Sequence, residues 1–284
     1  MSHIEIPSSE YVAQIEQEAK RVAGSPDYLD PEGYISQNTW GMLVQAGLLE
    51  AALHRRDPKN YRPEKMEIIR RTSRIDPQLG LMYGIMTALI IDNLYKFGTP
   101  DQIHKYFEKI RKGQLYGLGF TDENKSGSSI DMESNFTKSY LTFSKRFQGI
   151  SGYDLLVFAL QENNPAILGL FVVAQRDITS EIIHTEGLRR IRYALNSGHV
   201  PMSQVDQIVI LNTRRDLARI QQIFTDSRLG FPGMSLGQLE LLERLAREYS
   251  ENRLIGTTLQ KDMAVPQREL ESITARRIII QAIY

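Results

Sequence analysis

Cysteine is absent from the 284-residue sequence, and neither sign of charge is in excess. Without cysteine the chain forms no disulfide, and no thiolate acts as nucleophile or metal ligand. Lysine and arginine together number 34, as do aspartate and glutamate, so the formal net charge is zero. General nucleic-acid binders normally carry a basic excess. We therefore expect no nucleic-acid partner, and we predict a cytoplasmic location, with which the lack of cysteine is compatible.

Long apolar runs are also missing. The first twenty residues contain acidic side chains and no apolar core of the kind found in signal peptides. The most apolar stretch with helical character, 79–95, carries Asp92 and Asn93 and is short for a bilayer span. We expect this stretch to be a buried helix and the chain to have no membrane span.

Several motifs of common catalytic and cofactor sites do not occur. None of the five histidines is spaced to form a metal-binding pair, so no metal site is predicted. The P-loop and the dinucleotide-binding turn G-x-G-x-x-G are missing as well. The sequence thus gives no support to enzyme classes that depend on these motifs.

Helical patterns dominate residues 1–115, which we predict to be a helical N-terminal domain. Apolar residues recur at helical spacing over 40–51, and Asp76-Pro77 is typical of an N-cap followed by proline at the first helical position. Gly98 is typical of the residue after a helix end. Thr99-Pro100-Asp101-Gln102 predicts a capping box that begins the next helix.

The pattern changes at about residue 116. Short runs of strand-like composition cover 140–143, 155–160 and 167–174, and a turn is predicted between the last two. We predict a β middle domain over 116–210, built as a small antiparallel barrel or sandwich.

Residues 211–284 return to helical spacing. Gly230 and Pro232 should kink or break the first helix of this part, and a final apolar helix is expected to begin near Pro266. The order of helices, strands and helices makes the expected fold class α+β and multidomain.

A polar loop follows the first predicted strand. The strand-like run stops at Thr121-Asp122, and the loop ends in Gly127-Ser128-Ser129. Small residues with backbone N–H groups suit a phosphate-binding loop, but the same composition is typical of a polar turn that reverses the chain. Taken by themselves, the residues favour the turn.

An ordered set of short motifs resembles the acyl-CoA dehydrogenase family over nearly the whole chain. The set begins with Gly98-Thr99-Pro100-Asp101-Gln102, Lys105-Tyr106, Gly113, Gly119-Phe120-Thr121-Asp122 and Gly127-Ser128, where the family shows G-T-x-x-Q, K-Y, a glycine, a strand ending in T-E, and G-S. It continues with Leu141-x-x-x-Lys145, Tyr153-Asp154, Gly187-Leu188-Arg189, Val200-Pro201, Ser227-Arg228, Gly237, Tyr249, Arg253 and Gly256. No single motif is decisive, but their order is specific.

The resemblance implies a helical N-domain, a β-barrel or sandwich middle domain and a helical-bundle C-domain, with FAD as the cofactor. In the family the T-E/G-S loop lies against FAD, which makes Phe120, Thr121 and Ser128 candidate flavin contacts. The family's stretch that walls the flavin corresponds to Phe147-Gln148-Gly149, which keeps the aromatic ring and lacks the hydroxyl. Arg253 corresponds to an arginine that reaches the flavin diphosphate across a subunit contact.

The family's catalytic glutamate has no counterpart in this sequence. That carboxylate takes the α-proton of an acyl thioester while hydride passes to the flavin. Ser227 stands at the earlier of the two places where family members carry it, and Tyr284 comes before the later one. We therefore assign no catalytic residue, and we expect an incomplete C-terminal bundle with apolar faces that need a cover.

We predict an acyl-CoA dehydrogenase-like flavoprotein that acts on an acyl thioester of CoA or of a carrier protein. Its base or its missing helices would come from another chain, and a homo-oligomer or a partner subunit would cover the last helices. Three alternatives stay open: a flavin-dependent oxygenase on the same fold, a non-catalytic partner-binding relative, and a piece of a longer enzyme.

Overall fold

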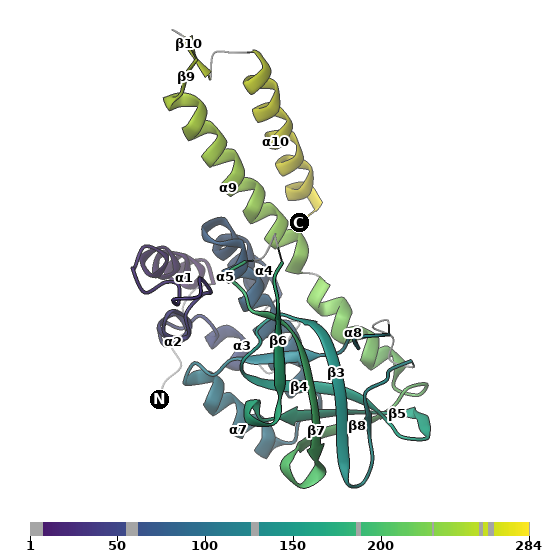
Figure 1. The fold of residues 1–284 in the computed structure, drawn as a ribbon. Coiled ribbons are helices and arrows are strands. Elements are labelled where there is room, and N and C mark those ends of the chain that lie inside the picture. The colour runs from purple at the N-terminus through teal and green to yellow at the C-terminus, as the bar shows by residue number, and fades with distance from the viewer. Residues whose placement is uncertain are drawn as a thin grey trace.

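A computed structural model describes residues 8–54, 62–125, 131–185, 189–228, 230–255, 258–260 and 264–283. Helices come first along the chain, a large sheet follows, and helices return at the end (Figure 1). The first helices are α1 (Ser8–Ala23), α2 (Gln37–Gln45), α3 (Glu50–His54), α4 (Arg62–Ile75), α5 (Pro77–Gly84), the π-helix η1 (Ile85–Ile91), α6 (Asp92–Phe97) and α7 (Pro100–Arg111).

The strands and the last helices complete the chain. The large sheet contains β1 (Tyr116–Gly119), β2 (Asn135–Phe136), β3 (Tyr140–Gln148), β4 (Asp154–Gln161), β5 (Asn164–Val173), β6 (Thr179–Ile183), β7 (Tyr193–Pro201) and β8 (Asp206–Asn212), with short 3-10 turns η2 (Gln175–Asp177) and η3 (Met202–Gln204). Then come α8 (Leu217–Arg228), α9 (Gly230–Asn252), β9 (Leu254–Ile255), β10 (Thr258–Leu259) and α10 (Ala264–Ile283). The expected α+β order is confirmed, whereas the domain limits at residues 115 and 210 stay a prediction.

Helices α5 and α7 begin at the capping residues that the sequence predicts. Asp76 caps α5 by accepting a hydrogen bond from the Gln78 backbone N–H at 2.9 Å, and Pro77 takes the first helical position. Thr99 and Gln102 form the predicted capping box of α7. The break near Gly230 is also present, because α8 ends at Arg228 and α9 begins at Gly230.

The apolar stretch 79–95 is buried as predicted, but it is not one regular helix. It runs through α5, η1 and α6, and the π-helical turns of η1 were not predicted from the sequence. Asp92, which is 1% exposed, lies in this stretch because Lys65 of α4 pairs with it at 3.0 Å. None of the helices in the described part of the chain is long and apolar enough to cross a membrane.

The sheet has the strand order β6-β7-β3-β2-β4-β5-β8, with β1 beside β4. Both β1 and β2 run parallel to β4, so the sheet is mixed and the prediction of a wholly antiparallel one was wrong. Strand composition does not reveal this, because the direction of pairing depends on the connections between strands.

Both faces of β4 are buried. Leu156 and Phe158 pack into the core shared with the helices, whereas Leu155 and Val157 pack into a second core made of strand residues. Because the second core contains side chains from β2, β3, β4, β5 and β7, the sheet curls over itself. This agrees with the expected barrel or sandwich.

The motif at the start of α7 fastens that helix to the sheet. The Gln102 amide donates to Asp206 Oδ1 of β8 at 2.9 Å, and the Tyr106 hydroxyl donates to Asp206 Oδ2 at 2.6 Å. Lys105 pairs with the same carboxylate at 2.8 Å. The G-T-x-x-Q and K-Y residues therefore have a structural role in this chain.

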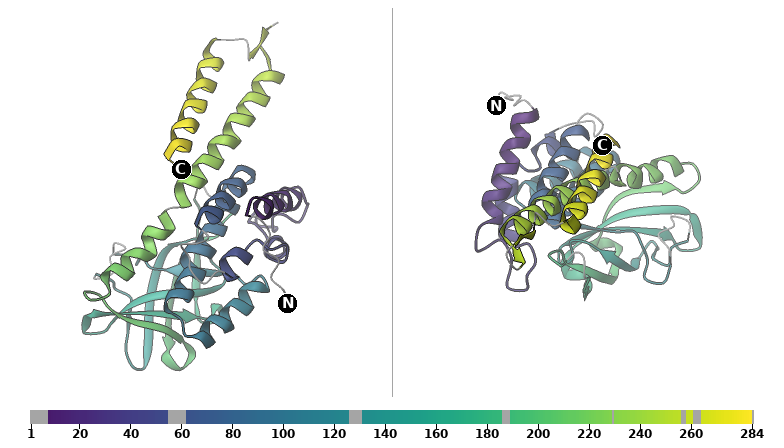
Figure 2. Two further views of the ribbon diagram at one scale, coloured as in Figure 1. Left: turned by 180° about the vertical axis from the view of Figure 1, so that it is seen from behind. Right: turned by 90° about the horizontal axis from the view of Figure 1, so that it is seen from above.

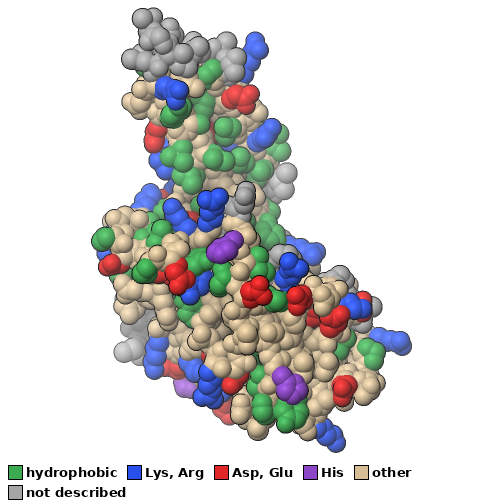
Figure 3. All heavy atoms as spheres, viewed as in Figure 1, with side chains coloured by type: hydrophobic (Ala, Val, Ile, Leu, Met, Phe, Trp, Pro, Cys, Tyr) green, Lys and Arg blue, Asp and Glu red, His purple; other side chains and the backbone are tan. Residues whose placement is uncertain are grey.

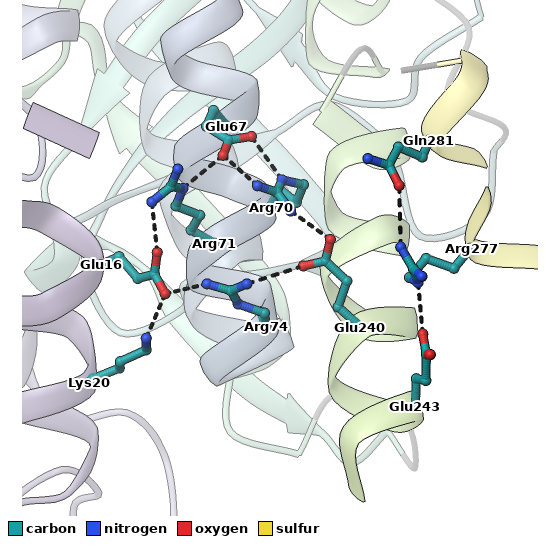
Figure 4. Close-up of polar contacts among 10 residues, drawn as sticks. All are labelled: Glu16, Lys20, Glu67, Arg70, Arg71, Arg74, Glu240, Glu243, Arg277 and Gln281. Atoms are coloured by element: carbon teal, nitrogen blue, oxygen red, sulfur yellow. Dashed lines mark hydrogen bonds and ion pairs between the residues drawn. The ribbon is translucent and has the colours of Figure 1, made fainter. Parts of the chain in front are cut away.

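Helix α9 crosses α4 at very close range. A Cβ atom on Gly237 would lie 2.2 Å from the Arg70 carbonyl oxygen, so only glycine fits at this crossing. One turn further along α9, Glu240 pairs with Arg70 at 2.5 Å and with Arg74 at 3.7 Å. Figure 4 shows these contacts continuing through Arg74 to Glu16 of α1, so that one ion-pair network joins α1, α4 and α9.

Beyond this network, the second half of α9 and all of α10 project from the body as a helical hairpin (Figures 1 and 2). Apolar side chains are exposed on this projection, where Figure 3 shows them in green. The exposed large apolar side chains of α9 and α10 include Leu242, Leu245, Tyr249, Ile278 and Ile279, each between 46% and 61% exposed.

Candidate functional site

A groove runs between the sheet and helix α8. The residues just after β1 and Arg146 of β3 line it from the sheet side, and one face of α8 lines it from the other. Its volume is about 720 Å³, which is within the usual range for small-molecule and cofactor sites. The lining residues are Leu89, Leu118, Phe120, Thr121, Arg146, Gln221, Phe224, Thr225 and Arg228.

Phe120 and Thr121 form part of the groove wall just past the end of β1. The Phe120 ring packs edge-on against Phe158 of β4, with centroids 5.4 Å apart, and lies 4.3 Å from the ring of Phe224 on α8. Thr121 is half-buried, and its carbonyl accepts a hydrogen bond from the Arg146 N–H at 2.9 Å. Two of the predicted flavin contacts therefore lie side by side in one groove.

A buried ion pair lies directly behind this wall. Lys145 Nζ is 2.7 Å from Asp122 Oδ1, and neither side chain has exposed surface. Burial lowers the pKa of Lys145 to about 8 although the Asp122 charge opposes the shift. Burial raises the pKa of Asp122, but the charge and hydrogen bond of Lys145, together with the hydrogen bonds from Ser134, outweigh it and leave that pKa below its ordinary value.

Helix α8 is held in place by a carboxylate on the side away from the groove. Asp226 is 4% exposed and pairs with Arg62 of α4 at 2.5 Å and with Lys96 of α6 at 2.8 Å. Burial raises the pKa of Asp226, but Lys96 and the other nearby cations outweigh it and leave that pKa below its ordinary value. Asp226 therefore anchors the helix, and its carboxylate is engaged by two cations.

A second, apolar cavity adjoins the groove. It measures about 70 Å³, and Leu89 of η1 lines both spaces. Ser227 lines the cavity while the next residue, Arg228, lines the groove. The other lining residues are Ile69, Gly80, Leu81, Gly84, Ile85, Gly230, Phe231 and Met234, so none of the described residues that line this cavity titrates.

The π-helix η1 also meets the end of β3. A Cβ atom on Gly149 would lie 2.9 Å from Ile85 Cδ1, so the position at which the family carries a hydroxyl faces an apolar side chain here. The next residue, Ile150, is 3% exposed and has φ 66°, a left-handed conformation that is rare for a β-branched side chain. Such strained backbone is frequent near functional sites.

The remaining predicted site residues are not gathered at the groove. Arg253 follows α9 in the projecting hairpin, is exposed, and lies over the Tyr249 ring at 5.2 Å. Phe147 belongs to β3, but its side chain lies outside what the structure describes, and Ser128 lies outside the described residues. Ser227 is on α8, where its hydroxyl donates to the Phe224 carbonyl at 2.8 Å.

The pentapeptide Gly233-Met234-Ser235-Leu236-Gly237 matches G-x-S-x-G, the pattern of the nucleophile elbow in α/β-hydrolases. It lies wholly within α9. A nucleophile elbow requires a sharp turn from a strand into a helix, so this stretch is not one.

Sequence reasoning missed most of the residues on the α8 side of the groove. Arg146 directly follows the motif residue Lys145, and Arg228 is itself part of a motif, so the motifs of the sequence could have pointed to both residues. Gln221 and Thr225 carry no motif signal. Gln221, Thr225 and Arg228 share one face of α8, because they follow one another at spacings of four and three residues. The sequence does not show that this face lies opposite the sheet.

The polar lining of the groove consists of hydrogen-bond donors. A flavin ring has carbonyl oxygens and its diphosphate is anionic, so both need donors, and the rings of Phe120 and Phe224 provide flat apolar surface. No carboxylate is found among the described lining residues. The residues present therefore fit a flavin, with the difference that Gly149 contributes no hydroxyl. The donors are Thr121, Arg146, Gln221 and Arg228, whereas the Thr225 hydroxyl donates to the Gln221 carbonyl at 3.1 Å.

Comparison with known proteins gives a weak match in sequence. No family model matches the chain. The mitochondrial isovaleryl-CoA dehydrogenase of Solanum tuberosum is 29% identical over 129 residues, which cover 43% of this chain and 30% of that protein. The matched part thus spans less than a third of the curated relative.

Comparison with solved structures gives a much longer match. Butyryl-CoA dehydrogenase from Megasphaera elsdenii aligns with a TM-score of 0.76 and 15% identity over 98% of this chain and 78% of its own. A Mycobacterium smegmatis glutaryl-CoA dehydrogenase in complex with FADH2 gives 0.77 and 13% over 96% and 73%. The prolyl acyl carrier protein oxidase AnaB gives 0.77 and 14% over 99% and 78%. Likeness at such low identity establishes the fold, and the chain has an acyl-CoA dehydrogenase-like fold.

Proposed function

We propose that the chain is a flavoprotein that binds FAD in the groove and the acyl group of a thioester in the adjoining apolar cavity. The observation that carries this proposal is that the groove and the cavity adjoin. Leu89 lines both spaces, Ser227 lines the cavity, and the next residue, Arg228, lines the groove. Structural neighbours include a glutaryl-CoA dehydrogenase with FADH2 and a prolyl acyl carrier protein oxidase, which supports a thioester of CoA or of a carrier protein.

The residues around the junction would bind and orient the reactants. The Thr121 hydroxyl and the Arg228 guanidinium would donate hydrogen bonds to the ring oxygens or the diphosphate, and the apolar lining around Ile69 and Met234 would exclude water from the acyl chain. When bound, FAD supplies a two-electron acceptor. The small volume of the cavity, about 70 Å³, favours a short acyl group.

Removal of an α-proton has no candidate base in the described lining. Ser227 uses its hydroxyl to donate to a helix carbonyl, and Asp226 is engaged by Arg62 and Lys96. We therefore propose that the base comes from another chain or segment. A flavin-dependent oxygenase is the second candidate, because an apolar cavity without a titratable side chain suits a reaction that needs no such base.

The first test is the visible absorbance spectrum of the purified chain before and after incubation with FAD and desalting. We expect a retained flavin spectrum, and we expect Thr121→Val to weaken FAD binding about three- to tenfold by removing one hydrogen bond. Thr179→Val, in the exposed strand β6, is the matched control and should leave the affinity unchanged. A protein that takes up no FAD would refute the proposal.

A second measurement separates the two reactions. Anaerobic mixing of short acyl thioesters with the FAD-loaded protein, in the assembly that supplies the base, should bleach the flavin if a thioester is oxidised. Oxygen uptake that requires a flavin reductant, with no bleaching by any thioester, would favour the oxygenase instead.

We also propose that the projecting hairpin is a contact surface for another helical chain or a second copy. Leu242, Leu245 and Tyr249 follow one another at spacings of three and four residues on α9, and Ile278 and Ile279 of α10 are exposed nearby. Light scattering after size-exclusion chromatography should show an assembly that Leu245→Glu dissociates. The control Ile182→Glu, at a 37% exposed position in β6, should leave it intact.

A further inference from the structure

The Asp122–Lys145 pair joins three segments of chain behind the groove. Asp122 follows β1, and Lys145 belongs to β3. Asp122 Oδ2 also accepts from the backbone N–H of Glu133 at 2.6 Å and of Ser134 at 3.2 Å, and Oδ1 accepts from the Ser134 hydroxyl. Lys145 Nζ donates to the Phe120 carbonyl at 3.1 Å as well. The two side chains thus fix β3, the chain after β1 and the chain that leads into β2.

The sequence neighbours of the pair line the groove. Thr121 directly precedes Asp122, and Arg146 directly follows Lys145. Two backbone hydrogen bonds flank the pair, one from the Arg146 N–H to the Thr121 carbonyl at 2.9 Å and one from the Glu123 N–H to the Ser144 carbonyl at 3.1 Å. Any shift of the pair would therefore move both groove residues.

Stability alone is a poor reason for such a pair. Two fully buried charges lose their hydration, and replacing a buried ion pair by well-packed neutral groups is often neutral or stabilising. In some proteins a buried pair instead selects one geometry, because a charge left unpaired in the interior is costly. Past Gly119, the last residue of β1, the isolated β-bridge between Asp122 and Lys145 joins the wall segment to β3, and the Phe120 ring packs against Phe158 and Phe224.

We propose that Asp122 and Lys145 are positioning residues, which place Thr121 and Arg146 for binding of FAD. The inference rests on the proposed function for its ligand, and on the geometry alone for its structural part. The pair does not touch the groove itself, since neither side chain is among its lining residues. Its effect on the ligand therefore passes through the two residues that it places.

The chain offers a matched control in the pair Lys65–Asp92. Its side chains are 5% and 1% exposed and 3.0 Å apart, and it joins α4 to α6 without a residue in the groove lining. The test compares Asp122→Asn/Lys145→Met with Asp92→Asn/Lys65→Met. Both double variants remove two buried charges and keep similar volumes, so both report on loss of a buried pair.

Two readouts are taken at a temperature where both variants are folded. In Asp122→Asn/Lys145→Met, the Arg146 and Glu123 amides should exchange hydrogen about tenfold faster or more, and FAD should bind about tenfold more weakly. The control should show wild-type exchange at these two amides. FAD affinity is compared only with the wild type and Asp122→Glu, because the charge of Lys65 also acts on Asp226, the anchor of α8. Asp122→Glu keeps the charge and should bring both readouts back towards the wild type, which a general loss of stability would not explain.

Each outcome decides one of the two proposals. Unchanged exchange at Arg146 and Glu123 would overturn the positioning role, as would equally faster exchange of these two amides in both double variants. Another outcome is that the wild-type chain binds no FAD while the two amides exchange faster in Asp122→Asn/Lys145→Met and not in the control. In that case the proposed function fails, and the pair is shown to fix the wall. Faster exchange without loss of FAD affinity would refute the link to the ligand.

Discussion

The groove wall and the projecting hairpin are built in opposite ways. The wall has fully buried polar groups, contacts between residues far apart in sequence, and an aromatic pair that joins sheet to helix. In the hairpin, exposed ion pairs such as Arg244–Glu248 lie one helical turn apart, and large apolar side chains face outwards. The described part of the wall is therefore held by its own buried contacts, whereas the hairpin exposes large apolar side chains of the kind that interfaces bury.

The sharpest way to test this contrast is to remove one leucine from the core behind the wall and one from the hairpin. Leu156 of β4 is fully buried, so Leu156→Ala should lower the free energy of unfolding by about 2–5 kcal/mol. Leu245 of α9 is 46% exposed, so Leu245→Ala should change it by about 0.5 kcal/mol or less in the dissociated chain. Urea denaturation measures both. Equal losses would mean that the hairpin is as well packed as the body.

The crossing of α4 and α9 is where the hairpin helix joins the body of the protein. Gly237→Ala would bring a Cβ atom to 2.2 Å from the Arg70 carbonyl oxygen, so we expect a loss of about 1–3 kcal/mol. Gly41→Ala in α2 is the matched control. Outside its own stretch of helix no heavy atom lies within 4 Å of its added Cβ, and a gain of about 0.5–1 kcal/mol is expected from helix propensity. A neutral Gly237→Ala would show that α9 moves away from α4 at no cost.

Acid should weaken the network that ties α9 to the body. Burial raises the pKa of Glu16, but hydrogen bonds from Lys20 and Arg74 outweigh it and bring the pKa to about 2, against an ordinary 4.5. Because the folded pKa is the lower one, Glu16 stabilises the fold fully above about pH 4.5, and this contribution is lost as the pH falls to about 2.

The measurement is the urea midpoint of the wild type and of Glu16→Gln as a function of pH. The wild type should be more stable at pH 7, and the gap should close as the pH falls through this window. A gap that stays constant down to the lowest pH would show that the carboxylate is not held by Lys20, Arg71 and Arg74 as the structure has it.

The smallest effect is expected within the hairpin itself. Arg244 and Glu248 are each 54% exposed, so a double-mutant cycle should give a coupling of about 0.5 kcal/mol or less that high salt removes. The pair Arg70–Glu240, 19% and 15% exposed and bridging two helices, should show the larger coupling. The opposite order would contradict the contrast between the two regions.

Much of the fold was predictable because its signals are local. The N-cap at Asp76, the capping box at Thr99 and the turn at Asn163, whose φ is 62°, each depend on atoms a few residues apart. The π-helix and the parallel pairing of β1 with β4 were not predictable in that way, because packing and chain connection decide them.

In the candidate site, too, some residues could be named from local sequence, whereas others depend on tertiary packing. The motif residues Phe120 and Thr121 could be named from the sequence, and the structure places them together. Their partners on α8 follow about a hundred residues later and carry little signal, while Gly149 faces Ile85 because of how η1 lies against β3. The roles of Phe120, Thr121, Ser128, Phe147, Gly149 and Arg253 towards FAD stay predictions.

The sequence by itself determined the order of helices and strands, the caps that begin the helices, and the absence of thiol chemistry, since each follows from residue type and near neighbours. The tertiary structure alone decided that Asp122 and Lys145 are buried as a pair, that a donor-lined groove opens beside them, and that the end of α9 faces solvent. These features depend on surfaces brought together from distant parts of the chain, and no local pattern specifies which surfaces will meet.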